Sequence, residues 1–436
     1  MSARTLPLKS AGAGSILGQY PRARTSQVSD ARTLLVKLVT VAVFAVCMSA
    51  PEYVLASPDP DALNPFVGPM KLLLLGLACV LVFLCRSSRY IKPIARPFVW
   101  FIVWTLICWI VSGANALPFR NLVSSFEGIV VLAGLCGAAE FVDGVRGMVG
   151  LLIWALVITT VVSVLLGVLG VEVMPGEIAT LGQLEWFHGI GTPAYMVAAC
   201  ACLIAWVLAR QLADPGFRSV GPILLLLVIP ALSFLRTYLI GIVFTIIAAA
   251  LLALRRQGKG RSKALRGGTK RLLLLVSLSL IAGAVIFFMK TSSREEGNEL
   301  SGRQIIWPIE IASVIQHPIV GLGPFGDIQL LYFDEQLPQV GAAHSDYLGA
   351  AVCYGLPGLF LFVGALMGLW KRVVRFPTLT TEERICRDAA LLSLVGLATT
   401  IVAENVIRDP RTFSLHLLFP ALCLTAVASV HQRTVR

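Results

Sequence analysis

Long apolar runs are the feature that most constrains what this chain can fold into. Segments of the length that a membrane-spanning helix needs, about 20 residues, recur along nearly the whole sequence and are separated by short charged or turn-forming stretches. Backbone in lipid must satisfy its own hydrogen bonds, and helices do so within a single segment. We therefore predict an all-α integral membrane protein with about twelve transmembrane helices.

The predicted spans agree with the composition. They lie near 33–50, 70–85, 98–117, 121–140, 147–170, 190–209, 219–235, 237–254, 272–289, 347–370, 388–404 and 413–430. Charged residues make up only 14% of the chain and hydrophobic residues 57%, whereas soluble domains usually carry roughly 25% charged residues. A soluble fold of 436 residues could not bury that much apolar surface.

The basic residues define the orientation. With the N-terminus in the cytoplasm and alternating spans, most of the 36 Lys and Arg residues fall on the cytoplasmic side, as the positive-inside rule requires. The outer segments hold Arg120, Arg236, Lys290, Arg294, Arg303, Arg408 and Arg411. The net charge of +12 therefore reflects membrane topology, and we expect membrane lipids rather than nucleic acid as partners.

This topology divides the chain into five parts. We predict a disordered cytoplasmic arm at 1–31, helices one to nine within 32–289, a large outer loop at 290–346, helices ten to twelve within 347–430, and a cytoplasmic tail at 431–436. Both termini are thus cytoplasmic. The outer loop is expected to contain short helices, because apolar residues recur at helical spacing from Ile305 to Ile315.

Two outer arginines are candidates for binding an anion. Arg236 lies in SFLRTY, in a very short turn between two spans, and Arg303 precedes the amphipathic stretch, whose helix N-terminus adds positive potential. The planar guanidinium pairs phosphate oxygens bidentately. Snorkelling or an ion pair is the other interpretation of Arg236, and a solvated loop residue that of Arg303.

His344 is the candidate base. It lies in GAAHSDYLGAA, where the outer loop meets the tenth span, and a histidine accepts protons near neutral pH. A packing role is the alternative. His188 and His317 are also on the outer side, but no HxxxH spacing joins them, so we predict no metal site. The glycine-rich segment 317–326 is predicted to be a tight turn, since no Lys-Ser/Thr follows it.

Acidic residues supply further candidates. Glu127 is a carboxylate inside the fourth span, where such groups are costly and often functional, so helix pairing and a site role are both open. Glu404, Arg408, Asp409 and Arg411 cluster in the last outer loop, either as a local ion-pair network or as a third element of the anion site.

The ordered set of motifs resembles a known family. A short outer turn with arginine, then SGRxxxW, then HPxxGxGP, then HSxYLxxxxxxGLPGL is similar to the O-antigen ligase/polymerase superfamily of GT-C-type membrane glycosyltransferases. The resemblance covers about 230–370. It departs from the family where Thr237 follows Arg236 in place of glycine and where Ser345 replaces the common asparagine.

The resemblance implies an activity and its residues. Arg236 and Arg303 would hold the diphosphate of an undecaprenyl-linked glycan, and His344 would activate the acceptor hydroxyl, without cofactor or metal. The loop 290–346 would then be catalytic and periplasmic, in a bacterial inner membrane. Supporting candidates are Tyr347, Glu404, Arg408, Arg411, His317 and Glu127.

Four functions fit these observations. We expect an O-antigen ligase that transfers the glycan to lipid A–core oligosaccharide with inversion. A polymerase with the same donor and another glycan as acceptor is the nearest alternative, followed by a protein-glycosylating relative. An anion transporter belongs to a different class; it would place its polar residues at the midplane and within internal repeats, neither of which the sequence suggests.

Overall fold

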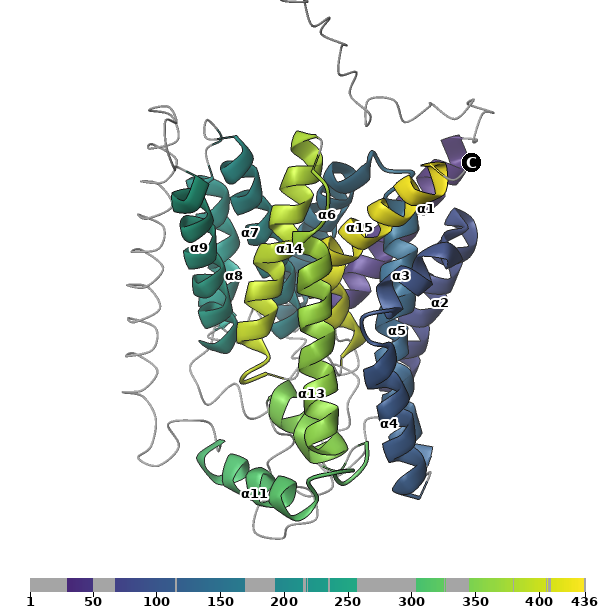
Figure 1. Ribbon diagram of the computed structural model, residues 1–436. Coiled ribbons are helices and arrows are strands. Elements are labelled where there is room, and N and C mark those ends of the chain that lie inside the picture. The colour runs from purple at the N-terminus through teal and green to yellow at the C-terminus, as the bar shows by residue number, and fades with distance from the viewer. Residues whose placement is uncertain are drawn as a thin grey trace, which may run out of the picture.

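A computed structural model describes most of the predicted helical regions (Figure 1). The described residues are 30–49, 67–113, 116–168, 193–214, 217, 219–233, 236–256, 303–324, 326, 345–378, 380–404, 406 and 409–434. Within these ranges helices are joined by turns and irregular residues, and the one residue assigned to a β-bridge is isolated, which agrees with the predicted all-α class. Residues 1–29 of the predicted arm at 1–31 and the whole ninth span at 272–289 lie outside the described residues, whereas Asp30 and Ala31 already belong to the first helix.

The helices match most of the predicted spans. Their bounds are α1 Asp30–Met48, α2 Val67–Cys85, η2 Ser87–Tyr90, α3 Ile91–Ala95, α4 Val99–Val111, α5 Ala116–Ala138, α6 Gly144–Val168, α7 Pro193–Ala213, α8 Val220–Ser233, α9 Arg236–Arg256, α11 Arg303–Gln316, α13 Asp346–Val374, α14 Thr381–Thr400 and α15 Pro410–Thr434. The amphipathic stretch at 305–315 is confirmed as α11.

Length and apolar composition mark several of these helices as membrane spans. Among the described residues five helices qualify, namely α1, α6, α7, α9 and α13, and a sixth is formed if α2 and the bent segment after it count as one. Helices α4 and α8 and the apolar part of α5 are shorter apolar segments. The protein is therefore a multi-pass membrane protein by helix composition.

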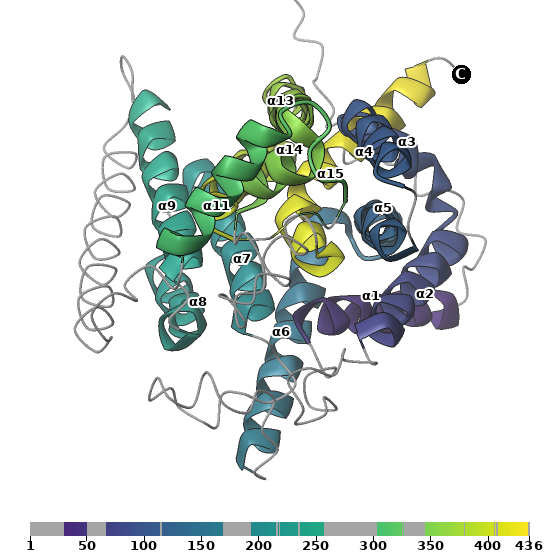
Figure 2. The same cartoon turned by 90° about the horizontal axis from the view of Figure 1, so that it is seen from below.

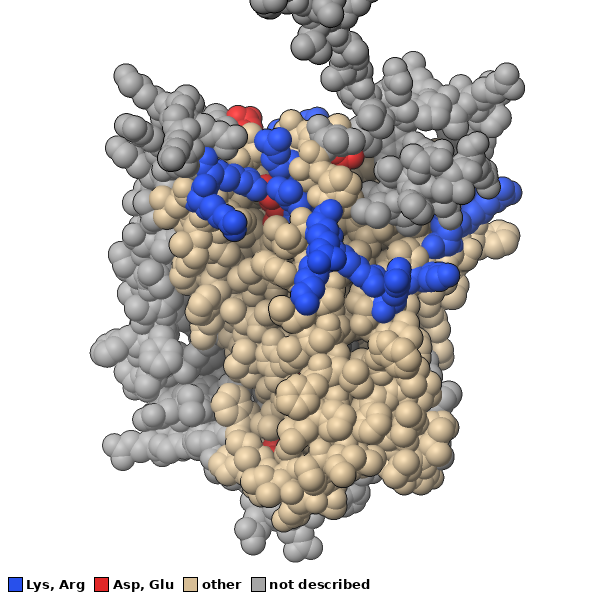
Figure 3. Space-filling view, viewed as in Figure 1, with Lys and Arg blue, Asp and Glu red and all other residues tan. Residues whose placement is uncertain are grey.

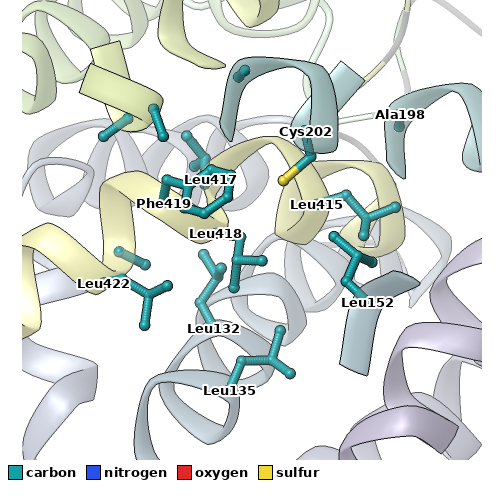
Figure 4. Close-up of a cluster of buried hydrophobic side chains, with 14 of the residues drawn as sticks. Leu132, Leu135, Leu152, Ala198, Cys202, Leu415, Leu417, Leu418, Phe419 and Leu422 are labelled. Atoms are coloured by element: carbon teal, nitrogen blue, oxygen red, sulfur yellow. The ribbon is translucent and has the colours of Figure 1, made fainter. Parts of the chain in front are cut away.

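Helix α15 forms the centre of the bundle (Figure 2). Every side chain described from Pro410 to Thr425 is buried, and α15 packs against α5, α7 and α14. Figure 4 shows leucine side chains of α5 and α6 meeting those of α15, with Ala198 and Cys202 of α7 beside them. The polar residues Arg411, Thr412, Ser414 and His416 are buried at its start, and the helix is mostly apolar from Leu417 onward, as an enclosed helix requires.

Two helices show the most informative departures from the predicted spans. Helix α14 begins at Thr381, seven residues before the predicted 388–404, because Thr380 and Glu383 form a reciprocal capping box. Helix α13 is not one continuous span at 347–370. It is broken at Gly355, whose φ of 69° and ψ of −176° are non-helical.

The charges are segregated along the bundle axis. Figure 3 shows that lysine and arginine gather over the upper part of the described face, around the ends of α9, α13 and α14. In this view the described surface below the band shows almost no charged side chains, and large apolar side chains of the bundle, among them Phe83, Phe360 and Leu225, are 70% exposed or more. This is the pattern of a lipid-facing belt below a basic interface.

Candidate functional site

Several helix ends converge on the face opposite the basic band. Helix α9 runs antiparallel to α14, because Arg256 at the end of α9 pairs with Asp388 near the start of α14, whereas Gly241 near the start of α9 contacts Thr400 at the end of α14. The starts of α9, α13 and α15 therefore lie beside the end of α14, and the loop 401–409 joins α14 to α15 at that point.

The start of α13 is fixed to this loop. The backbone N–H of Asp346 donates to the carbonyl oxygen of Ile401 at 3.0 Å, and the Asp346 carboxylate accepts from the backbone N–H of Val406 at 2.7 Å. The Ser345 hydroxyl caps the helix by accepting from the N–H of Leu348 at 3.3 Å. Of the two residues that follow His344, Ser345 is thus held by the helix and Asp346 by the loop.

Helix α13 then folds back on itself at Gly355. The rings of Tyr347 and Phe362 have centroids 5.7 Å apart, whereas an unbroken helix rising 1.5 Å per residue would separate the two residues by about 22 Å along its axis. The segment 346–354 is therefore a short helix that lies beside the long helix 356–374.

The turn that follows α11 docks on this break. The backbone N–H groups of Leu322 and Gly323 donate to the carbonyl oxygens of Val352 and Cys353, at 2.8 and 2.9 Å. These carbonyls end the short helix, so the turn caps it. Gly321 has a φ of 69°, and a Cβ there would lie 2.5 Å from the Val352 carbonyl oxygen. The prediction that the glycine-rich segment is a tight turn is confirmed.

This arrangement separates His317 from the start of α13. His317 directly follows α11 and is exposed, and its carbonyl oxygen accepts from the N–H of Gly321 in the turn. The turn contacts the Gly355 end of the short helix, and Ser345 lies at the other end, roughly 13 Å away along nine residues of helix. The structure does not bring His317 to the segment that carries His344.

The Arg411 guanidinium forms several hydrogen bonds on this face. It is buried, and its guanidinium contacts both carboxylate oxygens of Asp409 at 3.0 to 3.2 Å. It also donates to the Tyr195 hydroxyl at 2.7 Å and to the Ser49 carbonyl oxygen at 3.2 Å. Of the two roles that the sequence left open for this loop, the ion-pair network is therefore the one seen for Arg411, and it joins α1, α7 and α15.

The charge state of Asp409 follows from this network. Burial alone would raise the pKa of its carboxyl group, but the adjacent Arg411 guanidinium and the Tyr195 hydroxyl stabilise the carboxylate and hold the pKa below the ordinary value of 3.8. Asp409 is consequently ionised at neutral pH, and the pair is formally neutral.

Helix α9 begins with the first candidate arginine. Arg236 is its first residue. Helix α9 approaches α14 so closely at Gly241 that a Cβ there would lie 2.3 Å from the Thr400 hydroxyl oxygen. Tyr238, two residues after Arg236, stacks on His416 of α15 with ring centroids 6.1 Å apart. Asp346 is among the carboxylates that lie within electrostatic range of Tyr238.

The second candidate arginine also begins a helix. Arg303 is the first residue of α11. Figures 1 and 2 both show α11 crossing beneath the bundle from the α9 side to α13, and its C-terminal turn contacts α13 near Gly355. The N-terminal end of α11 is therefore the end on the α9 side, and both arginines occupy N-terminal positions, where the helix dipole favours anions.

The remaining candidates are placed as follows. The Tyr347 hydroxyl donates to the Ala398 carbonyl oxygen at 3.3 Å, which ties α13 to α14. Glu404 is half-buried in the loop 401–409, within electrostatic range of Tyr238. Glu127 is buried in α5, and the next residue, Gly128, faces the Phe413 ring of α15. His344 and Arg408 lie outside the described residues.

The sequence alone did not identify three of the polar residues on this face as candidates. Asp346, Tyr195 and His416 were not singled out, although each is packed into the convergence of helix ends. The position of Asp346, two residues after His344 at the expected start of a span, was a usable signal, because a carboxylate at the edge of a span usually has a specific partner. Tyr195 carried no such signal. Within the described residues no group of three or more histidine, cysteine, aspartate or glutamate side chains could hold a metal ion.

Fold and site together define a multi-pass α-helical membrane protein with a polar face opposite its basic band. Residues 221–363 match the O-antigen ligase family, a group of membrane glycosyltransferases that comprises ligases and polymerases acting on lipid-linked O-antigen. This segment contains α8, α9, α11 and the start and break of α13, so the predicted resemblance over 230–370 is confirmed. A comparison with curated proteins gave no match.

Proposed function

We propose that this protein is an O-antigen ligase of the bacterial inner membrane. It transfers O-antigen polysaccharide from undecaprenyl diphosphate to lipid A–core oligosaccharide on the periplasmic face, in the biosynthesis of lipopolysaccharide. The observation that carries the proposal is the family match over 221–363 together with the place of its motifs. Arg236 and Arg303 begin helices, and Ser345, which follows His344, begins a third.

The proposed topology puts this face outside the cytoplasm. About twelve spans with both termini cytoplasmic would place the basic band on the cytoplasmic side and residues 290–346 in the periplasm. Impermeant thiol labelling of cysteines placed at Ser301 and Ser262 tests this orientation in cells. Labelling of position 262 from outside would reverse the topology and contradict the proposal.

The proposed reaction depends more on positioning the two substrates than on activating the leaving group. The acceptor hydroxyl attacks the anomeric carbon as the bond to the diphosphate breaks, His344 takes the hydroxyl proton, and undecaprenyl diphosphate leaves with inversion. Diphosphate is already a good leaving group, so the main tasks are orientation and neutralisation of developing negative charge. Two arginines at helix N-termini supply positive potential for that purpose without a metal ion.

The ion-pair network has a supporting role in this proposal. Because Asp409 already neutralises Arg411, Arg411 is less suited than Arg236 or Arg303 to hold a diphosphate. We assign it instead to fixing the loop 401–409, against which the start of α13 is hydrogen-bonded. The site would then consist of the loop 401–409, the start of α13 that is bonded to it, and the two arginines at the starts of α9 and α11.

Deletion of the gene in a strain that makes full-length O-antigen tests the function and its nearest alternative. Loss of a ligase leaves bare lipid A–core, with O-antigen chains retained on the lipid carrier. Loss of a polymerase leaves core that bears a single repeat unit. Unchanged lipopolysaccharide in the deletion strain would exclude both and favour the transporter.

A further inference from the structure

The basic band consists of two clusters that differ in their counter-ions. In the cluster at the ends of α9 and α14, Arg256 and Arg387 contact the Asp388 carboxylate at 2.8 and 3.4 Å, and the Asp388 side chain is fully buried. This cluster therefore contains its own negative charge. Figure 3 shows a second group of basic side chains further along the same band.

The second group, here called the α3–α13 cluster, has no such carboxylate. It comprises Lys92, Arg96, Lys371, Arg372 and Arg375. None of the five forms an ion pair with a carboxylate in the described part of the chain. Arg96 and Arg372 lie close enough to repel each other electrostatically, and Arg372 is half-buried. An anion between two such guanidinium groups would remove this repulsion.

The backbone puts this cluster at the level of lipid headgroups. Helix α2 ends at Cys85, and the segment 87–95 turns away from it by 108°. Tyr90 and Ile94 of that segment are buried against the bundle, whereas Lys92 is exposed. The segment thus lies across the end of a membrane span with its charged side outward, as interfacial helices do. Arg372 lies in the last turn of α13, another candidate span.

Exposed apolar side chains lie directly beside the cations. Trp100 is 72% exposed one helical turn after Arg96, and Val374 is 48% exposed two residues after Arg372. Helices α4 and α13, which carry these two residues, pack against each other. A ligand with a negatively charged head and long acyl chains would satisfy both the cations and the apolar surface. A free anion would satisfy only the cations.

We propose that the α3–α13 cluster is a binding site for the phosphate headgroup of an anionic phospholipid, with Arg96 and Arg372 as its principal ligands. The bound lipid lies with its acyl chains along α4 and α13. It holds the interfacial segment 87–95 and the end of α13 together, and it is a component of the folded protein rather than a substrate. The site is independent of the face that contains Ser345 and Asp409.

Titration of the delipidated full-length protein with phosphatidylglycerol, followed by native mass spectrometry, tests the proposal. The double variant Arg96→Gln/Arg372→Gln should bind this lipid about ten- to thirtyfold more weakly than the wild type. The matched control, Arg255→Gln/Arg384→Gln, removes two exposed cations from the other cluster and should change affinity less than about twofold. Binding of phosphatidylcholine should be equal in all variants.

Several outcomes would overturn the proposal. If both double variants lost the same affinity for phosphatidylglycerol, the lipid would be attracted by general interfacial charge and there would be no defined site. Unchanged affinity in Arg96→Gln/Arg372→Gln would exclude these ligands, and displacement of the lipid by inorganic phosphate alone would indicate a free-anion site. If the double variant does not fold, Arg96→Gln alone, at an exposed position, should still weaken binding about fivefold, and wild-type affinity there would reject the site.

Discussion

Asp346 and Val406, sixty positions apart in the chain, are joined by a hydrogen bond of 2.7 Å from the Val406 backbone N–H to the Asp346 carboxylate. Both groups are buried. The bond fixes the start of α13, and hence the residue that follows His344, against the loop that leads into α15. Together with the bond from the Asp346 N–H to the Ile401 carbonyl oxygen, it connects the loop that carries Asp409 to the proposed catalytic segment.

Removing this carboxylate should disturb transfer more than folding. Asp346→Ala leaves a buried backbone N–H without its acceptor, which costs about 1–3 kcal/mol. A displacement of about 1 Å in the adjacent segment can lower the rate about a hundredfold. Asp346→Asn keeps an acceptor oxygen and should restore most of the activity. Thermal unfolding in detergent and a transfer assay check both variants, and an equally inactive Asn variant would argue against a positioning role.

The break in α13 should depend on glycine at position 355. In Gly355→Ala the backbone, with φ 69° and ψ −176°, lies in a region that essentially only glycine adopts, which costs about 1–3 kcal/mol, and the new Cβ would lie 2.1 Å from the Ile319 carbonyl oxygen. We expect a lower unfolding temperature and loss of activity. Gly364→Ala is the matched control in the same helix, since a Cβ there meets nothing within 4 Å. It should be neutral or stabilise by about 0.5–1 kcal/mol, and equal effects at both positions would contradict the described turn.

Sequence patterns predicted the helices better than their ends and contacts. The predicted span 237–254 corresponds closely to α9, because a run of apolar residues bounded by arginines is a local signal. The break at Gly355 was not predicted, since it depends on docking of the turn after α11, which no local pattern reveals. The early start of α14 at Thr381 did have a local signal, the Thr380–Glu383 capping box.

The candidate site shows the same division. The positions of Arg236 and Arg303 at turns before helices could be inferred from charge and periodicity, because outer cations are rare in a membrane protein. The burial of Arg411 between Asp409 and Tyr195 could not, since Tyr195 lies more than two hundred residues away. Pairings between distant helices follow from packing, which a single sequence does not specify.

Arg411 should be needed chiefly for stability. Arg411→Ala leaves Asp409 without its cation in a buried site, which costs about 3–5 kcal/mol, so the unfolding temperature should fall clearly. Arg89→Ala is the control, because the Arg89–Glu140 pair is exposed, with side chains 47% and 40% accessible, and such pairs contribute about 0–1 kcal/mol. If Arg411→Ala unfolded at the wild-type temperature yet lost donor binding, Arg411 would belong to the anion site instead.

Arg236 and Arg303 should show the opposite behaviour. Arg236→Ala and Arg303→Ala are expected to keep the wild-type unfolding temperature and to lose most transfer activity and donor affinity. The corresponding lysine variants should keep only part of the transfer activity and donor affinity, because an ammonium supplies charge without the bidentate geometry of a guanidinium. Donor binding and transfer measured on purified variants check this. Full activity of both alanine variants would exclude the proposed diphosphate clamp.

The rate of glycan transfer by purified protein is the most direct test of the account. Wild-type protein and His344→Ala are supplied with undecaprenyl-diphosphate-linked O-antigen and lipid A–core, each with and without EDTA. We predict that the wild type transfers the glycan equally well with EDTA, because arginines provide the charge that a metal ion would otherwise supply. His344→Ala should still bind the donor but transfer it about 10²–10⁴-fold more slowly. Wild-type rates in His344→Ala, or activity that EDTA abolishes and a divalent ion restores, would contradict the account.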